Sequence, residues 1–173
     1  MKTFRFSASL ALAGALAGTA GAALAPTQAT QPPTLAAGER VQPFDAPSPS
    51  GATRQVNYPK GTVTVLLFFS SWCTTCAERQ DALSELARGL RDRVVFVGVV
   101  TEDEPAELDS YLRTHRAEFP VVVDTDGTIS RSYAVREPGA VVLVAKGGAL
   151  LRGWPGGLDA STLDTRIREL LLG

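Results

Sequence analysis

The sequence predicts an α/β fold in which helices cover both faces of a mixed central sheet. Two near-continuous apolar runs, residues 62–69 and 94–100, have the composition of strands that are buried on both faces. An amphipathic segment follows each of these runs, and a hairpin pattern with one more amphipathic segment ends the chain. Strands that alternate with helices and end in a hairpin plus a helix indicate a three-layer α/β/α sandwich.

The composition is that of an ordinary globular protein. The 173 residues carry a formal net charge of −1, with 45% hydrophobic and 20% charged residues. This balance gives no electrostatic footprint for nucleic acid, so we expect no nucleic-acid partner. The 2 cysteines are too few for a disulfide scaffold, and a bridge between them closes too short a loop to serve mainly for stability.

The first 38 residues precede the predicted domain and form two segments. Residues 1–25 begin with Lys2 and Arg5, continue as an apolar stretch and end at small residues, as a secretory signal peptide does. An uncleaved anchor is the alternative, because roughly 18 to 20 apolar residues can span a bilayer. Residues 26–38 hold three prolines without hydrophobic periodicity, which is typical of a flexible linker. We therefore expect the domain to span residues 39–173 in an extracytoplasmic compartment, periplasmic or secreted.

The first half of the domain leads to the cysteines and continues in a helix. Residues 41–57 contain prolines and a Ser-Gly turn, which predict a short edge hairpin laid against the domain. Residues 62–69 (TVTVLLFF) predict a central strand that ends just before the cysteines. After Cys76, apolar residues recur at spacings of three and four, which predicts a helix of about four turns.

The second half repeats this order of strand and helix. Residues 94–100 predict a buried strand, and Pro105 predicts the start of a helix that carries His115 on its apolar face. The acidic residues before this helix are expected to be a solvated helix cap rather than a site: Glu102, Asp103 and Glu104.

The remaining segments complete the sheet and the last helix. Residues 119–123 predict a third strand closed by an Asp-Gly turn, and residues 129–133 a short helix. Residues 141–145 and 149–153 flank turn glycines and predict a hairpin. Either Asp159 or Ser161 caps a last helix, whose expected apolar face comprises Leu163, Ile167, Leu170 and Leu171.

The pentapeptide 72–76, Trp-Cys-Thr-Thr-Cys, places both cysteines at the junction of a predicted strand and a predicted helix. Unpaired backbone N–H groups and the positive end of the helix dipole favour a thiolate on Cys73. Cys76 lies one turn inside the helix, close enough to form a disulfide with Cys73. This arrangement predicts a thiol–disulfide oxidoreductase.

Two other interpretations of the cysteine pair stay open. The protein is then either a non-catalytic secreted binding domain with an inert disulfide or a copper metallochaperone that uses His115. Zinc requires four ligands, and the chain has no third cysteine and only 1 histidine. His115 on an apolar helix face is more typical of a structural histidine, so we assign no metal ligand. Trp72 is expected either in the core or as a flat docking surface beside the nucleophile.

Three runs of the sequence, residues 66–76, 119–124 and 133–138, resemble the thioredoxin superfamily and, within it, the TlpA-like secreted thiol–disulfide oxidoreductases. The resemblance covers about residues 38–172 and implies a thioredoxin-like fold. It implies that Cys73 is the exposed nucleophile and Cys76 the resolving thiol, with their redox-active disulfide and no other cofactor. It also implies protein disulfide or dithiol clients and a membrane thiol–disulfide electron donor.

The resemblance further implies which residues surround the cysteines. Pro138 is expected to be a cis-proline that faces the disulfide and shapes the substrate groove, with Trp72, Thr74 and Thr75 beside it. A gap-free alignment from Tyr133 places Gly139 at that position instead. The motif does not set the direction of electron flow, because such pairs span potentials from about −270 to about −120 mV. We expect a reductant, as in cytochrome maturation among TlpA-like proteins.

Overall fold

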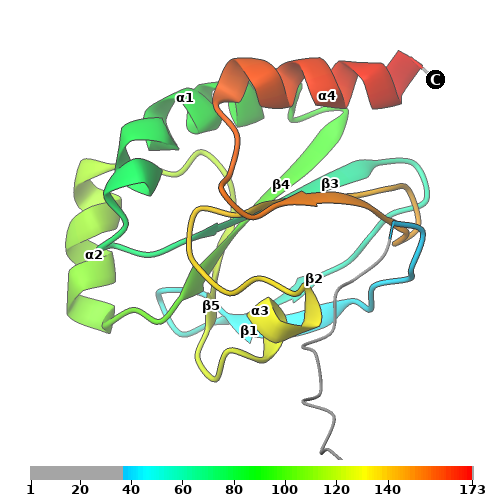
Figure 1. The fold of residues 1–173 in the computed structure, drawn as a ribbon. Coiled ribbons are helices and arrows are strands. Elements are labelled where there is room, and N and C mark those ends of the chain that lie inside the picture. The colour runs from blue at the N-terminus through cyan, green and yellow to red at the C-terminus, as the bar shows by residue number, and fades with distance from the viewer. Residues whose placement is uncertain (1–36, 173) are drawn as a thin grey trace, which may run out of the picture. The chain divides into compact units, whose positions relative to one another are not determined.

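A five-stranded mixed sheet forms the centre of residues 37–172, the part of the chain that this computed structural model describes (Figure 1). The strand order is β5-β4-β3-β6-β7. β4 pairs in parallel with both β3 and β5, whereas β6 pairs antiparallel with β3 and with β7. The predicted α/β class with a mixed sheet is therefore confirmed. The strands are β3 (Val63–Phe69), β4 (Val94–Thr101), β5 (Val121–Asp124), β6 (Val141–Val144) and β7 (Leu150–Trp154).

Helices and a separate hairpin cover the two faces of this sheet. The helices α1 (Thr74–Leu90) and α4 (Ala160–Leu172) lie together over one face (Figure 1). Helix α2 (Pro105–Thr114) adds apolar side chains to the same cluster. The opposite face is covered by α3 (Thr128–Ser132) and by the predicted hairpin of β1 (Phe44–Pro47) and β2 (Thr53–Val56). These layers form the expected sandwich.

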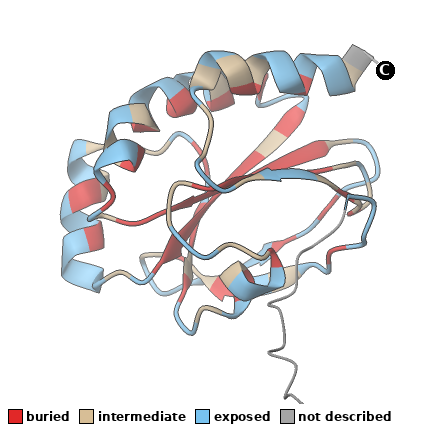
Figure 2. Cartoon of the chain, viewed as in Figure 1, coloured by how far each residue is buried: buried red, intermediate tan, exposed pale blue. Residues whose placement is uncertain are grey.

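The central strand β3 sends alternate side chains into two hydrophobic clusters, as a pleated strand must. All 7 of its residues are buried (Figure 2). Leu67 and Phe69 pack with α1 and α4, and Leu66 and Phe68 pack with the hairpin and α3. The prediction of a strand buried on both faces is confirmed, and it explains why the segment is continuously apolar.

The ends of several elements are set by single residues. Pro105 is at the start of α2, as predicted. The third strand begins at Val121 rather than at residue 119, because Pro120 has no N–H group to pair in the ladder. Asp159, not Ser161, caps α4, since its carboxylate accepts the backbone N–H of Thr162 at 2.9 Å.

The apolar face of α4 differs from the prediction at one position. Leu163 and Ile167 are fully buried, whereas Leu170 is 37% exposed. Leu171 packs against the core cluster in its place. Adjacent helical residues point about 100° apart, so both leucines cannot face the sheet equally.

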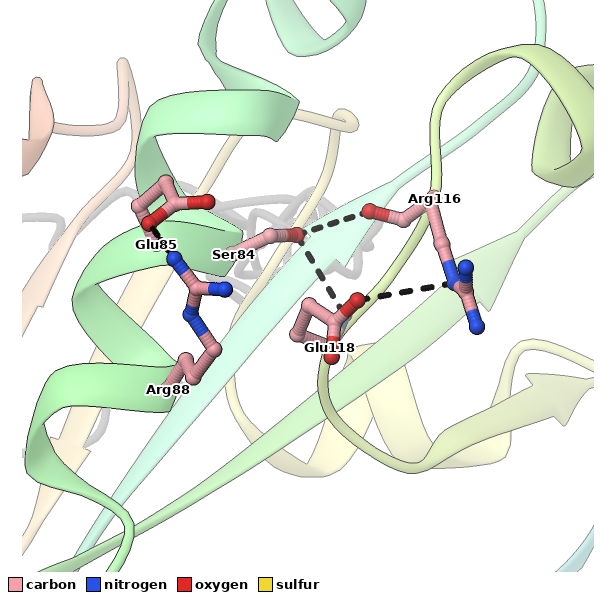
Figure 3. Close-up of polar contacts among 5 residues, drawn as sticks. All are labelled: Ser84, Glu85, Arg88, Arg116 and Glu118. Carbon is pink, nitrogen blue, oxygen red and sulfur yellow. Dashed lines mark hydrogen bonds and ion pairs between the residues drawn. The ribbon is translucent and has the colours of Figure 1, made fainter.

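A buried serine on α1 holds the connection between α2 and β5 (Figure 3). The Ser84 hydroxyl donates to the Arg116 carbonyl oxygen at 2.9 Å and accepts the Glu118 N–H at 3.4 Å. The nearby ion pairs, Arg116 with Glu118 and Arg88 with Glu85, are largely exposed and contribute little. The Ser84 hydrogen bonds therefore tie this loop to α1.

Residues 1–36 lie outside the described part of the chain. The expected signal segment or anchor (1–25) and most of the expected linker (26–38) therefore stay predictions. Within residues 37–172, no helix combines the length and the apolar character that crossing a membrane requires.

Candidate active site

The two cysteines lie where the central strand β3 leads into α1. Cys73 is the N-cap of α1 and has an extended backbone, and Cys76 lies in the first turn. The two residues form a disulfide with their Cα atoms 5.2 Å apart. Both side chains are mostly covered, with relative exposures of 8% for Cys73 and 6% for Cys76. The strand-to-helix junction thus places both sulfurs at one end of the sheet.

The backbone around Cys73 favours negative charge on its sulfur. Cys73 Sγ accepts the backbone N–H of Cys76 at 3.2 Å, in the position that an N-cap oxygen usually occupies. Thr75 Oγ1 lies 3.6 Å from the same sulfur. No acidic residue occupies the first turn of α1, so no negative charge there repels a thiolate on Cys73. After reduction, this environment stabilises a thiolate on Cys73.

Trp72 is a surface residue, so of the two expected environments the core is excluded and the exposed surface beside Cys73 is found. Its side chain is 56% exposed. The indole Nε1–H donates to the Glu102 carbonyl oxygen at 2.9 Å, which holds the ring beside Cys73. Thr74 and Thr75 are also exposed, on the first turn of α1. The three residues therefore present an exposed rim around Cys73.

Gly139 lies beside the disulfide, at the position that the gap-free alignment from Tyr133 gives it. Every peptide bond in residues 37–172 is trans, so the expectation of a cis-proline at Pro138 is wrong. A Cβ atom on Gly139 would lie 3.8 Å from Cys76 Sγ. The Gly139 N–H donates to the Phe68 carbonyl oxygen at 2.7 Å, which ties this segment to the end of β3. Gly139 has φ +100°, which a residue without Cβ adopts at no steric cost, so the chain passes Cys76 without a cis bond.

The loop between β7 and α4 closes the site on the Cys76 side. Arg79 Nη1 donates to the Gly156 carbonyl oxygen at 3.0 Å. A Cβ on Gly157 would overlap the Gly139 carbonyl oxygen and lie 2.5 Å from Arg79 Nη1. Gly157 thus permits a backbone approach that no other residue type allows. The Gly-Gly pair before the last helix is the only signal in the sequence that could have indicated this role.

A cavity of about 20 Å³ lies behind Cys76, with Leu67, Gln80 and Gly139 in its lining. Gln80 is 3% exposed, and its Nε2 has no hydrogen-bond partner among the described residues. A space of this size accommodates about one water molecule. The wall of the site next to Cys76 is therefore apolar apart from the Gln80 amide and Arg79.

Asp103 has a role at the site that the sequence analysis missed. Its carboxylate accepts the Ser71 backbone N–H at 2.5 Å and the Ser71 hydroxyl at 2.6 Å. The acidic segment does supply the expected N-cap of α2, Glu104, but the Glu104 side chain makes no cap hydrogen bond. The acidic segment instead fixes the loop before Cys73. Ser71 and Asp103 are 32 residues apart, and no local pattern indicates their pairing.

His115 lies at the end of α2 and stacks on Tyr111 with ring centroids 4.8 Å apart. This is the structural environment that the apolar helix face predicted. No group of three or more His, Cys, Asp or Glu side chains that could hold a metal ion occurs within the described residues.

Comparisons with known proteins show which family the chain is similar to. The AhpC/TSA family matches residues 37–152. The soluble secreted antigen MPT53 of Mycobacterium tuberculosis is 33% identical over 107 residues, which cover 62% of this chain and 61% of that protein. The thiol–disulfide oxidoreductase ResA of Bacillus cereus is 22% identical over 112 residues, which cover 64% of this chain and 65% of that protein. The chain thus spans less than two thirds of the length of these relatives.

A solved structure shares the fold. The crystal structure of a secreted Mycobacterium tuberculosis disulfide oxidoreductase homologous to Escherichia coli DsbE superposes with a TM-score of 0.64 at 25% identity. The match covers 73% of this chain and 96% of that one. It confirms the thioredoxin-like architecture that the resemblance implied.

Proposed function

Because the chain belongs to the thioredoxin-like AhpC/TSA family, we propose that it exchanges thiols and disulfides with protein partners through Cys73 and Cys76. The observation that carries this proposal is the disulfide at the start of α1, whose Cys73 sulfur accepts a helix N–H. A purely structural bridge would need no such donor. The relatives that are named for this chemistry support the proposal further.

The reaction proceeds in two exchanges that conserve electrons. In the reduced protein, the Cys73 thiolate attacks one sulfur of the partner's disulfide, and the other partner sulfur leaves as a thiolate and takes up a proton. Cys76 then loses its proton and attacks Cys73 Sγ, which releases the second partner thiol. The partner gains two electrons, and the Cys73–Cys76 disulfide forms. Oxidation of a partner is the same sequence in reverse.

Hydrogen bonding, rather than exposure, distinguishes the two cysteines. Their exposed fractions are nearly equal, at 8% for Cys73 and 6% for Cys76. Cys73 Sγ receives the helix N–H, whereas Cys76 Sγ lies against Gly139 and the small cavity. A thiolate is therefore more stable on Cys73, which makes Cys73 the nucleophile and Cys76 the resolving thiol.

The direction that we propose is reduction of partners. A strongly oxidising pair requires a reduced form that is well stabilised. Among the described residues, Cys73 Sγ has one backbone donor and a threonine hydroxyl nearby, and no Lys or Arg side chain hydrogen-bonds to either sulfur. Because the Cys73 thiolate of the reduced form receives only this limited stabilisation, a reducing potential is favoured. A membrane thiol–disulfide donor then returns the disulfide to the dithiol.

The proposed compartment is extracytoplasmic. Residues 1–25 have the composition of a secretory signal or an anchor. Two of the proteins to which the chain is similar are described as secreted. In such a compartment, the clients are proteins whose disulfides form by oxidation and must be reduced or rearranged.

Replacing each cysteine in turn tests the activity. Cys73→Ser should abolish reduction of insulin disulfides, because no nucleophile remains. In the Cys76→Ser variant, Cys73 should still attack the client's disulfide, and a mixed disulfide should accumulate because the resolving thiol is lost. Insulin turbidity and mass spectrometry of the trapped adduct measure the two outcomes. Activity that survives in Cys73→Ser would overturn the role of Cys73 as the nucleophile. Native thiols that do not react at all would leave only the non-catalytic binding domain.

A further inference from the structure

A surface hollow of about 370 Å³ lies beside the nucleophile, between the loop that precedes Cys73 and helix α2. Its lining includes Ser71, Trp72 and one face of α2 with Glu107, Ser110, Tyr111 and His115. The proposed exchange reaction does not use this hollow. Trp72 directly precedes Cys73 in the sequence, so one wall of the hollow adjoins the reacting cysteine.

Two polar atoms in this lining lack partners. The Tyr111 hydroxyl and His115 Nδ1 are buried and make no hydrogen bond to any described residue. Tyr111 as a whole is only 6% exposed. Unpaired buried polar groups are uncommon in native proteins because each one loses its hydration without compensation. Both atoms can accept hydrogen bonds, but they lie beneath the surface of the hollow, so an N–H donor meets them only where the lining moves.

The charges around the hollow are negative. Glu107 is the one charged side chain in its lining, which contains no Lys or Arg. The Ser71-bound carboxylate of Asp103 lies close by, and burial together with the charges of Asp81 and Asp103 raises the pKa of Tyr111 to about 12. A cation is therefore attracted to this hollow. The exposed Trp72 ring adds a face on which an ammonium or guanidinium group can stack.

We propose that the hollow binds a lysine or arginine side chain of the client polypeptide, a few residues from the cysteine that Cys73 attacks. The cation pairs with Glu107 and packs against Trp72, above the buried Tyr111 and the half-buried His115. The inference rests on the proposed thiol–disulfide exchange and assigns its preferred substrates as disulfides that are flanked by basic residues.

A set of three disulfide peptides tests this preference. The peptides differ only in one residue near the cysteine, which is Lys, Gln or Glu. The rate of mixed-disulfide formation is measured for each peptide with the Cys76→Ser protein. We expect the Lys peptide to react about threefold to tenfold faster than the Glu peptide, which corresponds to one partly exposed ion pair with a cation–π contact. The ratio should fall as salt concentration rises.

Charge reversal in the same background makes the test specific. Glu107→Lys should invert the ratio, so that the Glu peptide reacts faster. Asp109→Lys is the matched control, because it makes the same charge change at an exposed position of α2 outside the lining. The ratio cancels any effect of a substitution on the reactivity of Cys73 itself.

The outcomes separate the two proposals. Two results would overturn the basic-client inference and leave the exchange activity standing. One is equal rates for the three peptides with the Cys76→Ser protein. The other is a change in the rate ratio that is as large for Asp109→Lys as for Glu107→Lys. Absence of reaction with every peptide would overturn the exchange activity and this inference with it.

Discussion

Gly156 and Gly157 are adjacent residues with opposite structural demands. Gly157 has φ +73°, and a Cβ there would overlap the Gly139 carbonyl oxygen beside the disulfide. We expect Gly157→Ala to lower the free energy of unfolding by about 1 to 3 kcal/mol, because it combines overpacking with a left-handed backbone. Urea denaturation of the oxidised protein measures this loss.

Gly156→Ala is the matched control for that substitution. A Cβ on Gly156 would meet no atom within 4 Å, and its φ is not in the left-handed region. Its stability should therefore stay within about 0.5 kcal/mol of the wild type. If both variants lost the same stability, the tight approach of this loop to Gly139 would not be the cause.

At the scale of an element, the start of α4 depends on one carboxylate. Asp159 accepts hydrogen bonds from the Ser161 hydroxyl and from the N–H and hydroxyl of Thr162. These bonds, that from Ser161 first, hold the pKa of Asp159 well below its usual range. Because the folded-state pKa is depressed, the stabilisation is complete above the unfolded-state pKa of about 3.9 and is lost as the pH falls below it.

The substitution Asp159→Asn should remove this pH dependence. The amide still caps the helix but does not titrate, so the stability of the variant should fall less than that of the wild type between pH 5 and pH 2. Urea denaturation across this range measures both slopes. Asp109→Asn, at an exposed aspartate with no side-chain hydrogen bond in the described part of the chain, should follow the wild type. Parallel curves for all three proteins would contradict the capping role.

At the scale of the whole molecule, the disulfide and the stability of the fold are linked. A protein that acts as a reductant forms its disulfide more readily when folded than when unfolded. The oxidised form should therefore have the higher free energy of unfolding. Constraint of the unfolded chain alone contributes about 2 kcal/mol for a loop this short. We expect oxidised protein to exceed reduced protein in unfolding free energy by at least this amount.

Equilibration with glutathione measures the same linkage directly. The reduction potential should lie nearer to about −270 mV than to about −120 mV. A reduced form that is more stable than the oxidised form, with a potential near the upper value, would show that the protein oxidises its partners instead.

Much of the fold could be predicted because it depends on local pattern. The apolar run of β3 has no polar side because helices and the hairpin cover both of its faces. The position of Pro105 and the periodicity after Cys76 place α2 and α1 correctly. The disulfide follows from the same local logic, since residues three apart at a helix start lie side by side.

What the sequence by itself determined is therefore the order of the elements, the layers and the cysteine pair at the head of α1. Only the tertiary structure decided what surrounds that pair. Gly139 faces Cys76, Asp103 holds Ser71, and the face of α2 with Glu107 completes the hollow at Trp72. Each of these contacts joins residues that are at least 30 positions apart, so it depends on how the layers pack and leaves no periodic signal in the chain.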